Sequence, residues 1–144
     1  MAARQRQTYG EEVANVLTHG AGMLFGMTAI IVLMMAAIRS GNPWAIGSFA
    51  VYAVCMTLSY VTSTFYHAST HARQKRLLRR FDHGAIYLHI AGTYTPFTLL
   101  ALRQEGYWGW SLFAVIWIAA VIGVWLSFRK MRKKDHLKTV CYLA

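Results

Sequence analysis

The chain contains 144 residues, of which 56% are hydrophobic and 14% are charged, and its mean hydropathy is +0.35. Such an apolar composition is unusual for a soluble domain of this size and favours an integral membrane protein. The formal net charge is +10, which by itself suits either a nucleic acid or an anionic membrane surface as a partner.

Four long intervals without a formally charged residue divide the chain. Each can hold a membrane-spanning helix, which needs about 20 mostly apolar residues. A soluble protein with four buried helices would need a polar face at the helical period, and the second and fourth intervals show none. The sequence therefore predicts an all-α, polytopic membrane helix bundle with four spans, at residues 16–38, 44–66, 83–102 and 107–128.

The carboxyl end turns apolar again after the fourth span. The basic run "RKMRKKDH" is followed by "LKTVCYLA", which resembles the first turns of a fifth span. We therefore expect residues 1–144 to form a single transmembrane domain that is truncated at its carboxyl end. Ionisable side chains left facing lipid by the missing helices would favour self-association.

The distribution of basic residues predicts the orientation. Thirteen of the fifteen Lys and Arg residues precede the first span, separate the second from the third, or follow the fourth, and only Arg39 and Arg103 lie on the opposite side. The positive-inside rule then places the amino terminus in the cytoplasm of a multi-pass protein of the cell membrane. Cations split between these loops match anionic lipid headgroups, so we expect membrane lipids and no nucleic acid as partners.

Two features of the spans concern helix geometry. Gly22 and Gly26 form a small-xxx-small pair, which would let the first span pack closely on a neighbour. Pro96 removes a hydrogen bond from the third span and predicts a kink there, where Thr93 and Thr95 can supply compensating hydrogen bonds.

Polar side chains recur at helical spacing near the predicted cytoplasmic end of three spans. Ionisable groups within a membrane are costly and usually face a partner or a cavity, so this convergence predicts a functional site. The stripes are Glu12, Asn15 and His19; Ser63 and His67; and Asp82, Ile86, His89 and Thr93.

Imidazole and carboxylate groups together suit a metal site. Imidazole is the commonest metal ligand, and a carboxylate can take a proton from metal-bound water. Each residue also has a simpler interpretation: His67 as an interfacial histidine, Ser63 bonded to its own helix, and Asp82 as a helix amino-terminal charge. Spacing alone leaves both interpretations open.

Three segments resemble the bacterial hemolysin III family, which is related to the adiponectin and progestin receptor membrane proteins. They are "EEVANVLTHGAG" at 11–22, "STFYHA" at 63–68 and "DHGAIYLHIAGTYTPF" at 82–97. The resemblance implies a fold of seven helices with a cytoplasmic amino end. This chain would correspond to four of them and the start of the fifth.

The resemblance also implies a zinc ion near the cytoplasmic side. Its ligands are the histidine of a Ser-x-x-x-His motif, matched here by Ser63 and His67, and two histidines of a late His-x-x-x-His motif, which this sequence lacks. Asp82 matches the acid that meets the metal through water. The zinc site of these 144 residues is therefore expected to be incomplete, with His67 as its one family ligand.

Two classes of function follow from the resemblance. Relatives with this constellation are thought to hydrolyse lipid amides such as ceramides, with Asp82 and Ser63 as the matching catalytic residues. The alternative is a non-enzymatic membrane protein, either a cytolytic, hemolysin-like factor or a regulator of membrane state. A water-lined pore is not indicated, because the second and fourth spans lack a polar stripe.

The predicted topology can be tested with reporter fusions. Reporters placed after Arg76 and after Lys133 should be cytoplasmic, and one placed after Asn42 should be external, because consecutive spans cross the membrane in opposite directions. A cytoplasmic signal at Asn42 would contradict the assignment of the spans.

Overall fold

The computed structural model describes residues 8–129, and these residues form four long helices. They are α1 (Tyr9–Ser40), α2 (Pro43–Ala68), α3 (Ala72–Pro96) and α4 (Trp108–Phe128), with a short π-helix, η1 (Phe97–Ala101), after α3. The described residues contain no strand. The predicted all-α fold with four long helices is confirmed.

Local sequence signals set the ends of α1 and α2. The Thr8 hydroxyl accepts a hydrogen bond from the Glu11 backbone N–H at 3.3 Å, and the Glu11 carboxylate accepts one from the Thr8 N–H at 2.6 Å. This capping box starts α1. Gly41, with a φ of +64°, ends α1, and Asn42 then caps α2 by accepting from the Trp44 N–H at 3.0 Å.

The third helix differs from the predicted span. It begins at Ala72 rather than at residue 83, because the basic segment before the apolar part is itself helical. Helices α1, α2 and α4 are long and apolar enough to cross a membrane, whereas α3 is less apolar, with basic residues at its start and His, Thr and Tyr side chains along its length. The chain is therefore a membrane protein with three strongly apolar helices and one more polar helix.

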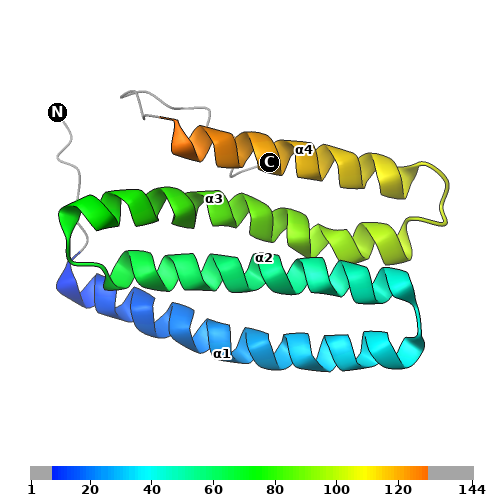
Figure 1. Cartoon of the computed structure of the whole chain (residues 1–144), viewed down its shortest axis with the longest axis horizontal. Helices are drawn as coiled ribbons and strands as arrows, with labels where there is room; N and C mark the ends of the chain where they lie inside the picture. The colour runs from blue at the N-terminus through cyan, green and yellow to red at the C-terminus, as the bar shows by residue number, and fades with distance from the viewer. Residues whose placement is uncertain (1–7, 130–144) are drawn as a thin grey trace.

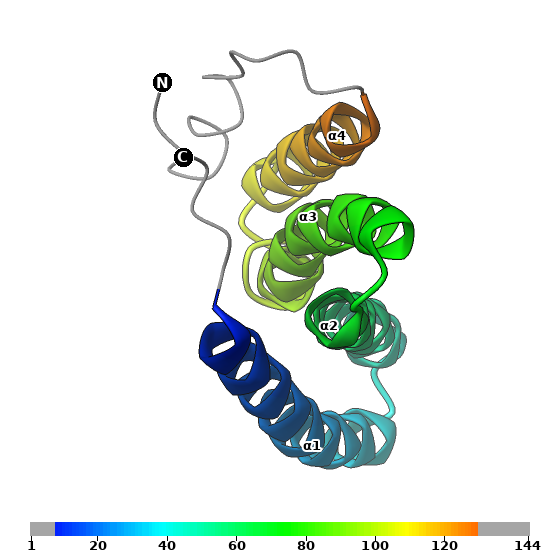
Figure 2. The ribbon, with the colours of Figure 1, turned by 90° about the vertical axis from the view of Figure 1, so that its left-hand side faces the viewer.

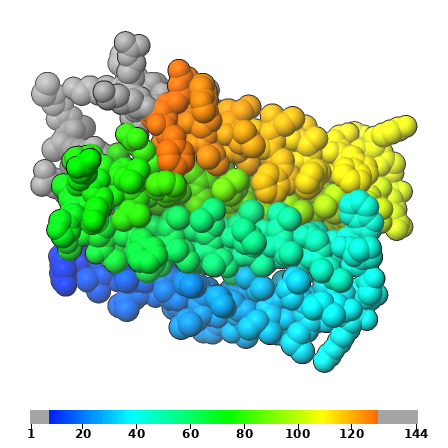
Figure 3. Space-filling model, viewed as in Figure 1, coloured from blue at the N-terminus to red at the C-terminus, as the bar shows by residue number. Residues whose placement is uncertain are grey.

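The helices pack in chain order as a curved row. Contacts join α1 to α2, α2 to α3, and α3 to α4, and Figures 1 and 2 show the four antiparallel helices side by side. In the space-filling view the helices lie against one another, with α1 along the lower edge and α4 along the upper edge (Figure 3). Large apolar side chains such as Leu24, Phe25 and Ile118 are well exposed, as suits helices surrounded by lipid.

Small residues allow the helices to approach closely. A Cβ atom added at Gly22 would lie 2.7 Å from the Tyr60 ring, and one added at Gly26 would lie 2.3 Å from the end of Met56. The predicted close packing of this glycine pair is confirmed. On the other side of the row, Gly123 of α4 packs directly against the buried Tyr87 ring of α3.

Pro96 does not end the helix but changes its winding. Helix α3 continues into η1, a π-helix, immediately after Pro96. The Thr95 hydroxyl donates to the Ala91 carbonyl at 2.8 Å and accepts from the Trp117 indole N–H at 3.1 Å. A wider helical turn therefore follows the proline, and a hydrogen bond ties that part of α3 to α4.

Helix packing at Gly123 gives a stability prediction. Gly123→Ala should destabilise the protein by about 1–3 kcal/mol, because a Cβ would lie 2.5 Å from the base of the Tyr87 ring, a contact too close to keep. Gly20→Ala is the matched control, since a Cβ there meets nothing within 4 Å and alanine favours the helix. Thermal unfolding in detergent should separate the two variants, and equal melting temperatures would contradict the packing.

Candidate functional site

Glu12 joins three helices at one end of the row. From α1, its Oε2 atom lies 2.7 Å from Nδ1 of His67 on α2, and its Oε1 atom lies 2.5 Å from Nζ of Lys75 on α3. The side chains of Glu12, His67 and Lys75 are 18%, 9% and 26% exposed, so the network is largely shielded. One carboxylate thus accepts from two partners on different helices.

His67 is surrounded by the other polar residues of α1. The Asn15 amide nitrogen lies 3.4 Å from His67 Nδ1, and the His19 ring stacks on the His67 ring at 5.8 Å with an interplanar angle of 8°. The predicted stripe of Glu12, Asn15 and His19 therefore faces a single imidazole. The Glu12 contact occupies Nδ1 and leaves Nε2 as the ring nitrogen able to bind another group.

Lys75 was not among the site residues predicted from the sequence, where it was counted with the basic loop. It precedes Asp82 by seven residues, two helical turns, and so lies on the face of α3 that carries Asp82 and His89. Extending that stripe backwards along α3 would have identified it. Its ammonium also lies 5.3 Å from the centre of the Tyr66 ring.

Ser63 and Asp82 lie close to this network in depth, but in the described residues they form no hydrogen bond or ion pair with it. Ser63 is buried at 6% exposure and Asp82 is half-buried. Between α2 and α3, Gly92 packs on Cys55, and this antiparallel register places Asp82 at the level of Ser63. Within residues 8–129, neither side chain forms a hydrogen bond or ion pair with His67.

A second group of rings continues from the network toward the middle of the helices. Tyr60 lies 6.2 Å from the His19 ring and 6.1 Å from the His89 ring, and Tyr52 meets His89 at 6.4 Å on its other side. His89 is therefore enclosed edge-on by two tyrosines of α2. The stripe of α3 that carries Asp82 and His89 does face α2, as helical spacing indicates.

The residues fit one part of a metal site. An imidazole that hydrogen-bonds a carboxylate through one nitrogen, and offers the other, is the usual form of a metal-binding histidine. His67 has this arrangement with Glu12. However, no group of three His, Cys, Asp or Glu side chains between residues 8 and 129 could hold a metal ion. This part of the chain therefore provides one suitable ligand and not a complete site.

The amino-acid sequence of the chain is similar to those of known proteins. Residues 7–144 match the family model described as haemolysin-III related. The chain is 41% identical to the Hemolysin-3 protein of Bacillus cereus over 97% of its own length, and 40% identical to the Hemolysin-3 homolog of Bacillus subtilis (strain 168) over 94%. It spans 63% of the length of each of these relatives. No solved structure matches the chain.

The Glu12–His67 pair can be tested with a double-mutant cycle. Glu12→Ala, His67→Ala and the double variant should give a coupling of about 1–2 kcal/mol in the free energy of unfolding, because the two groups are in direct contact and largely shielded. The control cycle pairs His67→Ala with Glu11→Ala, since Glu11 caps α1. We expect no coupling in the control, and equal coupling in both cycles would contradict the contact.

Proposed function

The chain belongs to the haemolysin-III-related family, and from this membership we propose that it is a membrane hydrolase of lipid amides with a zinc ion bound at His67. We further propose that it resides in the cell membrane with its amino end in the cytoplasm, as the positions of the basic residues favour. Membrane lipids are then both its surroundings and its substrate class.

The contact between Glu12 and His67 carries this proposal. At 2.7 Å, the carboxylate can accept the Nδ1 proton, which fixes the tautomer of the ring and leaves Nε2 as a basic electron-pair donor. Lys75 holds the other oxygen of the same carboxylate, so the imidazole has a defined orientation. A merely interfacial histidine would need no such support.

The remaining residues have roles that follow from their positions. Bound zinc would act as a Lewis acid toward the amide carbonyl and toward water. Asp82, at the depth of Ser63, would take up the proton released during hydrolysis. The Ser63 hydroxyl, one helical turn from His67, would orient the imidazole or donate to the oxygen that gains charge.

The other zinc ligands belong to the native-length protein in this proposal. The relatives are longer than this chain, and structural zinc sites have four ligands while catalytic ones have three and an open position. His67 would then be the ligand contributed by the first four helices. Purified native-length protein should contain zinc.

A cytolytic function is the second candidate, and the name of the Bacillus cereus relative favours it. The long exposed apolar faces of α1 and α4 would suit insertion into a foreign membrane. This function would not require an imidazole ligand, so dependence on His67 separates it from hydrolysis.

Variants of the native-length protein should show an ordered pattern. His67→Ala removes a ligand and should release most of the zinc, whereas Asp82→Asn should keep the zinc and lose hydrolysis of a ceramide. Ser63→Ala should lower affinity or activity by about 10–100-fold, as is typical of a supporting hydrogen bond. Metal content by elemental analysis and amide hydrolysis by mass spectrometry measure the two effects.

Glu12→Gln is the matched control, since it disturbs the same contact but leaves the His67 imidazole in place. It should weaken zinc binding without abolishing it. Full zinc content in His67→Ala, or full hydrolysis by Asp82→Asn, would rule out the hydrolase. Lysis of erythrocytes that persists in His67→Ala would support the cytolytic alternative.

A further inference from the structure

The beginning of α3 extends beyond the end of α4. Gly84 of α3 packs against Phe128, the last residue of α4, so residues 72–80 continue past it by about 13 Å, at 1.5 Å per residue. Figure 1 shows this extension on the side where α1 begins. It lies at the end of the molecule that the positive-inside rule assigns to the cytoplasm.

One stripe of this extension combines cations with exposed apolar side chains. Its members follow the i, i+3, i+4, i+7, i+8 spacing of a single helix face, and all five are exposed, Leu77 by 52% and Phe81 by 45%. They are Arg73, Arg76, Leu77, Arg80 and Phe81, and we call them the α3 basic stripe.

The cations of the α3 basic stripe have no acidic partner in the part of the chain that the structure describes. Glu12 is engaged by His67 and Lys75, and Asp82 follows Arg80 by two residues, which places it on the opposite side of α3. Within residues 8–129, three guanidinium groups therefore lie near one another without an ion pair. Each favours a planar, bidentate contact with phosphate or carboxylate oxygens.

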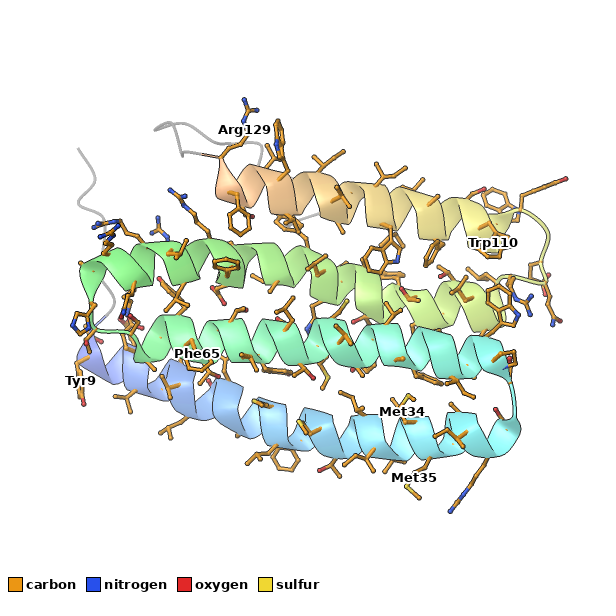
Figure 4. The ribbon with its side chains drawn as sticks, viewed as in Figure 1. Tyr9, Met34, Met35, Phe65, Trp110 and Arg129 are labelled. Atoms are coloured by element: carbon orange, nitrogen blue, oxygen red, sulfur yellow. The ribbon has the colours of Figure 1, made fainter. Side chains whose placement is uncertain are left out.

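The stripe is held in place and continues onto α4. Lys75, on another face of the same turns, is bound to Glu12, which fixes the start of α3 against α1. Phe81 meets the Phe128 ring edge-on at 5.0 Å, and the adjacent Arg129 lies over the Trp125 ring at 4.2 Å. Figure 4 shows Arg129 at the end of α4, above α3 and short of the point where α3 begins.

We infer that the α3 basic stripe is a docking surface for an anionic phospholipid, with the three arginines binding its phosphate headgroup and Leu77 and Phe81 contacting the upper part of its acyl chains. Charge complementarity selects the lipid, because a zwitterionic headgroup leaves the three positive charges uncompensated. The apolar pair places the stripe at the boundary between headgroups and chains, where basic amphipathic helices bind. The surface lies apart from His67 and requires no zinc.

Binding of phosphatidylglycerol tests this inference. In native mass spectrometry of the detergent-solubilised chain, phosphatidylglycerol should bind in preference to phosphatidylcholine. The triple variant R73Q/R76Q/R80Q should bind phosphatidylglycerol roughly 100-fold more weakly, taking about fivefold for each basic side chain near an anionic surface. Raising the salt concentration should weaken the binding of the unaltered chain.

A matched control removes the same charge elsewhere. The variant R132Q/K133Q/K134Q loses three cations from the segment after α4, which is predicted to lie on the same side of the membrane. It should keep most of the binding. An equal loss in both triple variants, or no preference for phosphatidylglycerol, would overturn the inference, since the attraction would then come from diffuse charge or be absent.

The variant R73K/R76K/R80K covers the case in which the glutamine variant does not fold. It keeps the charge but not the bidentate guanidinium geometry. Binding should fall severalfold while the preference for phosphatidylglycerol remains. Unchanged affinity for phosphatidylglycerol in this lysine variant would show that the arginines form no bidentate contact with the phosphate. That result would also overturn the inference.

Discussion

The arrangement of the first three helices depends on the two contacts that the Glu12 carboxylate makes. It accepts from His67 and Lys75, and so joins α1 to α2 and to α3 at the same end of the row. The backbones of α1 and α3 do not contact each other within residues 8–129, and the Glu12–Lys75 ion pair joins them through side chains. Away from bulk water such a bridge stabilises mainly because breaking it leaves a shielded charge without a partner.

The rest of the row relies on close contact at small residues and on a small apolar cluster of Tyr87, Ala91 and Ala120. Lipid is as apolar as leucine, so burying leucine against a neighbouring helix gains little in a membrane. The helices instead meet at glycine and other small residues, as at Gly92 on Cys55 and Gly123 on Tyr87. Many of their large apolar side chains face outward, whereas Met56, Tyr87 and the small Ala91 are buried. Shape complementarity at small residues therefore replaces the core of a soluble domain.

The polar network and the lipid-facing surface occupy different faces of the same helix. On α3, Lys75 points toward Glu12, while the α3 basic stripe, which includes Arg73 and Leu77 two residues before and after it, faces outward. A helix can separate these roles because residues two apart lie on nearly opposite sides. The turns of α3 that hold Lys75 against Glu12 can therefore also carry the α3 basic stripe. The two sets of residues do not overlap.

The sequence by itself determined the helices and their apolar character, because charge-free intervals, caps and helical spacing act locally. It also identified which residues of α1 share a face, and these do meet His67. It did not indicate that α3 begins at Ala72, because a basic segment is compatible with either a loop or a helix. Only the tertiary structure decided that Glu12 binds Lys75 and that, within residues 8–129, neither Ser63 nor Asp82 forms a hydrogen bond with His67. Helical spacing could have placed Lys75 on the right face of α3, but its partner depends on the register between helices, which is set by side-chain packing across the row.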